Sequence, residues 1–174
     1  MPQRSQPISE EEAVATRASV SKLIKHVLTA RNTGVFEKHI RDVLDTLLWK
    51  YTEASGKYST RYYSAASAGQ PEPLLRHEHV FQKRKMIDFF LSAATEAEID
   101  QILSEACGCV VTREEHNLLK PYDDEYGWIR YSKAKIAVMD RETGKVIAHC
   151  QPARLPTAVA RCPMKTRRRE RRVR

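Results

Sequence analysis

Apolar residues recur at helical spacing through the first third of the chain. Residues 9–32 place their Val, Leu and Ile side chains on one helical face, and Ser9 with Glu12 forms a capping-box pattern at the start. A second and stronger stripe covers residues 35–54, after a break at Gly34. Because the connection between the two segments is short, the pattern predicts an antiparallel helical hairpin.

Beyond this region the apolar runs are shorter and change period. Strands are expected at residues 57–64, 74–81, 107–112, 135–140 and 145–150. Helices are expected at residues 83–94, at 95–106, and from 112 onward. Thr95 with Glu98 and Thr112 with Glu115 are capping-box patterns that predict the starts of the last two helices.

The order of these elements predicts the fold class. They do not repeat as βαβ units, so a doubly wound parallel sheet is disfavoured. The chain is expected to be an α+β protein with an N-terminal helical hairpin, a small, mainly antiparallel sheet with packed helices, and a C-terminal β-hairpin.

Domain boundaries follow from the same pattern. Residues 1–8 are expected to be a flexible leader, and residues 9–150 a single α+β domain. Within that domain, residues 9–54 form the helical hairpin and residues 57–150 the α+β part. Three prolines and a run of arginines predict that residues 151–174 are an irregular tail.

Composition places the chain among soluble globular proteins. It has 174 residues, of which 41% are hydrophobic and 30% charged. No apolar run approaches the ~18 residues that a membrane span requires, so no membrane partner is expected. The polar, acidic N-terminus lacks the apolar segment of a signal peptide, which predicts a cytoplasmic location. Four cysteines in such a chain are expected to be reduced thiols. Cys107 and Cys109 are expected to be buried on a strand, although a zinc site remains conceivable.

The net charge of +8 is concentrated in the tail. Residues 165–174 hold seven basic residues and one glutamate, so the other residues hold 23 basic and 21 acidic side chains. Such a charge run commonly contacts nucleic acid, although it can also be a solvated end. The basic residues expected to bind nucleic acid are Lys165, Arg167, Arg168, Arg169, Arg171, Arg172 and Arg174.

Two short segments contain the side chains that are candidates for chemistry. The first includes His77, Glu78 and His79 next to an apolar run, and the second places His116 in the first turn of a predicted helix. On an extended strand His77 and His79 share one face and Glu78 lies on the other. Imidazole and carboxylate groups suit divalent ions such as Mg²⁺, Mn²⁺, Ni²⁺ or Zn²⁺. A bound ion polarises a phosphoryl oxygen while a free histidine deprotonates water.

The run Glu-His-Val, followed later by Cys-Val-Val-Thr-Arg-Glu-Glu-His-Asn-Leu-Leu, resembles the HNH-type nucleases of the ββα-metal class. The resemblance covers residues 74–119. It implies that Glu78 and His116 are metal ligands and that His79 is the general base. By the same resemblance Asn117 is a possible orienting residue, and we add His77 as a possible further ligand. A metal-dependent nuclease, or a degenerate relative of one, is therefore one expected function, with DNA favoured over RNA as the substrate.

Each of these features also has a purely structural interpretation. A Glu-Glu-His sequence at a helix start complements the helix dipole without any metal. Tyr58, Tyr62 and Tyr63 with their basic neighbours can stack on bases, but half-buried strand positions are favoured. The second expected function is therefore a non-catalytic, nucleic-acid-associated or protein-binding adaptor that uses the helical hairpin and the basic tail.

Overall fold

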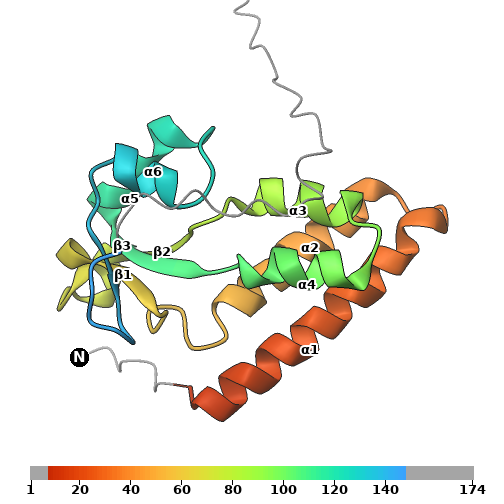
Figure 1. Cartoon of the computed structure of the whole chain (residues 1–174), viewed down its shortest axis with the longest axis horizontal. Helices are drawn as coiled ribbons and strands as arrows, with labels where there is room; N and C mark the ends of the chain where they lie inside the picture. Colours follow the sequence, from red (N-terminus) through yellow and green to blue (C-terminus); the bar gives the residue numbers. More distant parts are fainter. Residues whose placement is uncertain (1–7, 148–174) are drawn as a thin grey trace, which may run out of the picture.

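The computed structural model of the chain describes residues 8–147 (Figure 1). The seven basic tail residues expected to bind nucleic acid, Cys150, Cys162 and most of the leader lie outside the described residues.

The N-terminal part is the expected helical hairpin. Helix α1 (Glu10–Thr29) continues into a 3₁₀ turn (Ala30–Asn32), and helix α2 (Glu37–Thr52) returns alongside it. The Ser9 side chain accepts a hydrogen bond from the backbone N–H of Glu12, as the capping pattern predicts. The buried residues of the two stripes are Val20, Ile24, Leu28, Ile40, Leu44 and Leu48.

Four short strands form one mixed sheet in the order β2-β3-β1-β4. Their bounds are β1 Tyr62–Ser64, β2 Leu75–His79, β3 Gly108–Thr112 and β4 Val138–Asp140. The β2–β3 and β1–β4 pairs are antiparallel, and the central β1–β3 pair is parallel. A bridge between Met139 and Val146 extends the sheet at its C-terminal end. The expected α+β class with a mainly antiparallel sheet is therefore confirmed.

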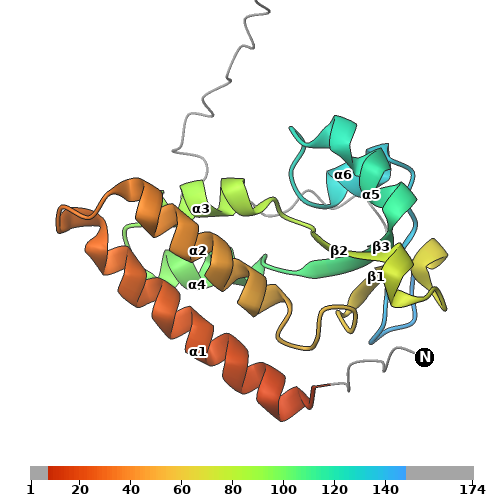
Figure 2. The same cartoon turned by 180° about the vertical axis from the view of Figure 1, so that it is seen from behind.

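The remaining helices lie in two groups. The bounds are α3 Lys83–Ser92, α4 Glu96–Ser104, α5 Arg113–Leu119 and α6 Trp128–Lys133. Helices α3 and α4 separate β2 from β3 in the chain and pack with α1 and α2 at one end of the molecule, whereas α5 and α6 lie together near the sheet (Figures 1 and 2). Both predicted capping boxes, at the starts of α4 and α5, are present.

Several local predictions differ from the structure. The strand expected at residues 135–140 is limited to β4, and the strand expected at 145–150 is limited to the bridge at Val146, with residues 148–150 outside the described residues. The strand expected at residues 57–64 is reduced to its last three residues, because Gly56 adopts a φ of 100° and accepts a hydrogen bond from Ser59 that closes a turn. Helix α6 was not predicted, since its six residues are too few to show a helical period. It begins after Gly127, which adopts a φ of 64°.

The core joins the helical layer to the sheet. Its fully buried side chains include Leu44 of α2, Phe90 of α3, Val111 of β3 and Tyr131 of α6. Cys109 is a buried free thiol on β3, as expected, and burial raises its pKa well above the ordinary value. The same expectation was wrong for Cys107, which lies just before β3 and is only partly buried. No helix among residues 8–147 is long and apolar enough to cross a membrane.

Tyr58, Tyr62 and Tyr63 are half-buried, as favoured from the sequence, but only Tyr62 and Tyr63 lie on a strand, whereas Tyr58 lies in the turn before β1. Tyr62 packs edge-to-face on Trp128 with a ring-centroid distance of 5.0 Å, and Arg141 lies 4.7 Å above the Tyr63 ring. The Tyr62 and Tyr63 rings therefore contribute to packing within the domain.

Arg31 ties the tip of the hairpin to the end of α3. Its Nη1 donates to the carbonyl oxygens of Phe90, Leu91 and Ala93 at 3.3, 3.1 and 2.7 Å, and its Nε donates to the Leu28 carbonyl oxygen at 2.9 Å. The guanidinium thus satisfies carbonyl groups that a helix end leaves without partners.

We expect Arg31→Met to lower the free energy of unfolding by about 2 kcal/mol, because the half-buried carbonyls lose a charged donor. Urea unfolding followed by circular dichroism measures the loss. Lys38→Met, at an exposed position in the first turn of α2, is the control and should change stability by less than about 0.5 kcal/mol. Equal effects of the two substitutions would contradict the proposed tie.

Candidate functional site

Glu78 and His116 form a direct pair where β2, β3 and α5 meet. The Nδ1 atom of His116 donates a hydrogen bond to Oε2 of Glu78 at 2.7 Å. Glu78 comes from the next-to-last position of β2, and the Thr112–Glu115 capping box starts α5 at the end of β3, so that its first turn faces β2. Residues 38 positions apart in the chain therefore meet as a carboxylate–imidazole pair.

The pair leaves one nitrogen of the imidazole available. A carboxylate that accepts from Nδ1–H fixes the tautomer in which Nε2 carries a lone pair. Nε2 of His116 makes no hydrogen bond to any residue of the described range, and 38% of the side chain is exposed. Glu78 is only 14% exposed, so the carboxylate is shielded and the imidazole faces outward.

A buried arginine holds the other side of the carboxylate. Nη1 of Arg130 donates to Oε1 of Glu78 and to the main-chain carbonyl oxygen of His79, each at 3.3 Å, and Nη2 donates to Asp123 at 2.8 Å. The Arg130 side chain is 4% exposed. Glu78 is thus fixed between His116 and Arg130, and α6 is tied to β2.

Basic side chains lie beside the exposed imidazole. Arg113, His116 and Lys120 are spaced so that they share one face of α5 and the turn that follows it. The Arg113 and Lys120 side chains are exposed. Arg76 lies two residues before Glu78 and therefore on the same face of β2. The faces of α5 and β2 that carry His116 and Glu78 therefore also carry three basic residues.

His77 and His79 lie on the opposite face of β2, against α2. Both are 7% exposed. The Thr52 hydroxyl lies 3.2 Å from Nε2 of His77 and 3.4 Å from Nε2 of His79, and Nδ1 of His77 donates to the Lys57 carbonyl oxygen at 2.9 Å. The Trp49 ring lies 4.5 Å from the His79 ring, centroid to centroid. Neither histidine is brought to the Glu78–His116 pair.

Burial makes these two histidines hard to protonate. Desolvation, together with the nearby positive charges of Lys57 and Lys83, lowers the pKa of His77 from 6.5 to about 4. For His79, desolvation together with His77 and Lys83 lowers the pKa to about 3. Both imidazoles are therefore neutral at pH 7 and serve the contact between α2 and the sheet.

The strand β3 is shaped to fit this cluster. Gly108 pairs with His79 across the β2–β3 ladder, and a Cβ atom at Gly108 would lie 2.3 Å from Cε1 of His77. The glycine therefore makes room for the imidazole ring.

The residues do not fit the divalent metal centre that the resemblance implies. Glu78 and His116 are each other's hydrogen-bond partners, and the Arg130 guanidinium brings a positive charge to the same carboxylate. Asn117 is exposed and accepts a hydrogen bond from Lys120 at 2.8 Å. Within residues 8–147 no three His, Cys, Asp or Glu side chains are grouped so that they could hold a metal ion.

Arg130 and its partner Asp123 were missed from the sequence. Arg130 lies in the run Trp-Ile-Arg-Tyr, where a charged residue stands among large apolar residues. That context indicates a buried arginine, which requires an acidic partner. No local pattern shows that the partner is Glu78, 52 positions away.

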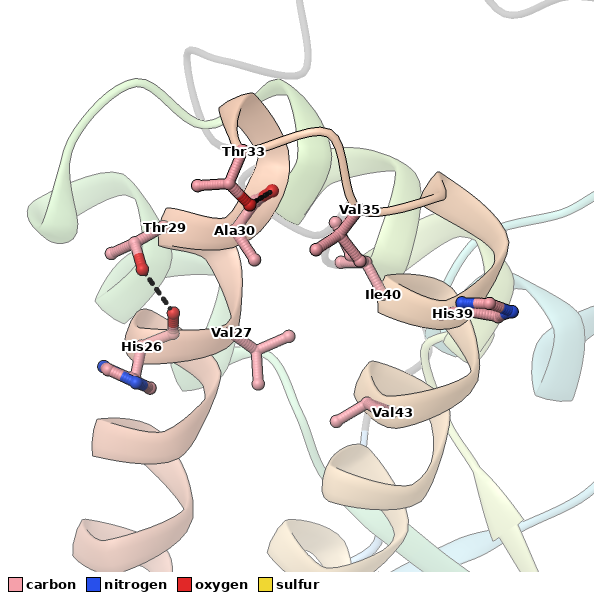
Figure 3. A pocket seen from close by; sticks show the side chains of 9 residues that line it. All are labelled: His26, Val27, Thr29, Ala30, Thr33, Val35, His39, Ile40 and Val43. Carbon is pink, nitrogen blue, oxygen red and sulfur yellow. Dashed lines mark hydrogen bonds between the residues drawn. The ribbon is translucent and has the colours of Figure 1, made fainter.

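The helical hairpin has an apolar hollow at its tip, the region named in the adaptor hypothesis. The hollow measures about 370 Å³, and Val27, Val35, Ile40 and Val43 are among the side chains that line it (Figure 3). Beside it, Phe36 is 75% exposed. The site of the Glu78–His116 pair is built by other elements of the fold.

Comparison with protein-family models, with curated proteins and with solved structures finds no match to this chain.

Proposed function

We propose that the protein cleaves phosphodiester bonds of nucleic acids, with His116 as the general base. The observation that carries the proposal is the 2.7 Å contact between Nδ1 of His116 and Glu78, which leaves Nε2 without a hydrogen bond to any described residue on a side chain that is 38% exposed. A carboxylate in this position orients the imidazole and stabilises the imidazolium that forms when a proton is taken. Glu78 is a positioning residue in this scheme.

The charges around the pair support a phosphodiester as the substrate. Arg113 and Lys120 flank His116 on its exposed helical face, and Arg76 lies on the same side of the sheet as Glu78. Arg130 neutralises the carboxylate from the buried side, which reduces the repulsion between Glu78 and a phosphate. Glu78 lies on β2, and His116 lies on α5, which directly follows the neighbouring strand β3. Helices α3 and α4 stand between these two strands in the chain, so the two residues, and not the connectivity, are what the structure shares with the ββα arrangement that the resemblance implies.

The experiment is cleavage of labelled DNA and RNA by the full chain, with EDTA or with Mg²⁺, Mn²⁺, Ni²⁺ or Zn²⁺. We expect His116→Gln to lower the rate by about 10²- to 10⁴-fold, the usual contribution of general-base catalysis. Glu78→Gln should lower it less, and Glu78→Asp should restore part of the activity. The matched control is His26→Gln, an exposed imidazole on α1, which should leave the rate unchanged.

Chemical rescue separates catalysis from a structural role. Imidazole added to His116→Gly should restore cleavage in a concentration-dependent manner, because a small base can enter the vacated space. Cleavage that persists in His116→Gln would refute the assignment of the base.

A second candidate function, the protein-binding adaptor, is favoured by the exposed apolar tip of the helical hairpin, where Phe36 and Val43 are 75% and 45% exposed. If the wild-type chain cleaves no nucleic acid under any of the conditions above, the adaptor becomes the better explanation.

A further inference from the structure

We infer that the substrate is RNA and that the attacking group is the 2′-hydroxyl of the substrate itself. The inference rests on the proposed function. It begins from the mismatch between the Glu78–His116–Arg130 cluster and a metal centre. The carboxylate of Glu78 already accepts hydrogen bonds from an imidazole and from a guanidinium, at 2.7 and 3.3 Å.

Hydrolysis of DNA demands more than this cluster supplies. A water molecule must be bound, deprotonated and aligned with the phosphorus, and the developing charge must be neutralised. Metal ions perform these tasks together in metal-dependent nucleases. At this cluster the available base is Nε2 of His116, whose side chain is 38% exposed, and residues 8–147 contain no grouped set of three metal-binding side chains.

Cleavage of RNA can proceed with a single positioned base. The 2′-hydroxyl is covalently held next to the phosphorus, so no separate nucleophile has to be bound. Well-oriented intramolecular reactions reach effective molarities of about 10⁵–10⁸ M. An imidazole held by a carboxylate supplies the remaining requirement, which is removal of the hydroxyl proton.

The proposed cleavage step needs one proton acceptor, His116 on α5, and water as the proton donor. Nε2 of His116 takes the proton from the 2′-hydroxyl, a bond forms between O2′ and phosphorus, and the bond between phosphorus and O5′ breaks. The leaving O5′ takes a proton from water, and His116 later returns its proton to solvent. The products are a 2′,3′-cyclic phosphate and a 5′-hydroxyl. Arg113 and Lys120, on the same face as His116, are placed to neutralise the phosphate.

The test uses the full chain with EDTA and a set of matched oligonucleotides. One is RNA, one is DNA of the same sequence, and one is RNA with a single 2′-deoxy or 2′-O-methyl residue at each cleaved position in turn. We expect cleavage of RNA in EDTA, 2′,3′-cyclic phosphate ends by mass spectrometry, and a more than ~10³-fold loss of cleavage at each modified position. His116→Gln should lower the rate at which these products form by about 10²- to 10⁴-fold, and His26→Gln should leave it unchanged.

Each outcome decides between specific alternatives. Cleavage of DNA, cleavage next to a 2′-O-methyl residue, or an absolute requirement for a metal ion would overturn the inference and leave the proposed nuclease function standing. Failure to cleave either nucleic acid with every ion tested would refute both.

Discussion

Lowering the pH from 7 to 4 is expected to destabilise the fold by about 6 kcal/mol through two residues, His77 and His79. Their pKa values are lowered by burial from 6.5 to about 4 and about 3. Over most of this range the unfolded chain therefore binds up to two more protons than the native chain. Each pH unit below 6.5 costs ~1.4 kcal/mol for each histidine, or ~3 kcal/mol each at pH 4. Urea unfolding at several pH values, followed by circular dichroism and tryptophan fluorescence, measures the effect.

The direction follows from the lowered pKa values. The stability contributed by neutral burial is present in full above pH 6.5 and is lost as the pH falls toward 4 and 3. Hydrogen bonding to Arg61 lowers the pKa of Asp140 to about 2. Protonation of this carboxyl therefore changes the free energy of unfolding mainly below about pH 4, outside the range in which His77 and His79 act. His79→Gln should remove about half of the pH dependence between 6.5 and 4, whereas His26→Gln should keep all of it. An unchanged slope in His79→Gln would contradict the assignment.

Removing the buried guanidinium is expected to have the largest effect of any single substitution near the site. Arg130→Met should lower the free energy of unfolding by about 3–5 kcal/mol, because Glu78 stays largely buried without its charged partner. Thermal and urea unfolding, followed by circular dichroism, measure the loss. Lys133→Met, which breaks the more exposed ion pair of the same helix with Glu125, should cost less than about 1 kcal/mol.

The double variant Arg130→Met/Glu78→Met distinguishes a charge effect from a packing effect. If the cost comes from an unpaired carboxylate, removing both charges should restore part of the stability. A double variant less stable than Arg130→Met would show that packing of the Arg130 stem dominates.

The sequence predicted the local elements well wherever a stripe or a cap was long enough to read. The two helices of the hairpin and the starts of α4 and α5 follow from apolar spacing and from Thr95 and Thr112. The bounds of strand β1 and the existence of helix α6 were not predicted. β1 has three residues and α6 has six, so contacts with neighbouring elements, and not a hydrophobic pattern of their own, stabilise them.

At the candidate site, the two-residue period of strand β2 predicted the side-chain arrangement better than the resemblance to the ββα-metal nucleases did. The period of a strand predicts that His77 and His79 share one face and that Glu78 lies on the other, and this is what β2 adopts. The resemblance to the ββα-metal nucleases instead implies that Glu78 and His79 act at one centre. The structure brings Glu78 to His116 and leaves His79 against Thr52 and Trp49. The role of Arg130 could not be predicted, because it depends on a contact between distant segments.

Helix α5 has only seven residues and would not persist as an isolated peptide. Glu115, one residue before His116, accepts hydrogen bonds from the backbone N–H of Thr112 and from the Ser64 hydroxyl at the end of β1. The rotational setting of α5 about its axis is therefore determined by the middle of the sheet. The orientation of His116 therefore depends in part on Ser64, which lies 52 positions earlier in the chain. Ser64 does not contact the His116 imidazole, but it helps to orient the ring through Glu115.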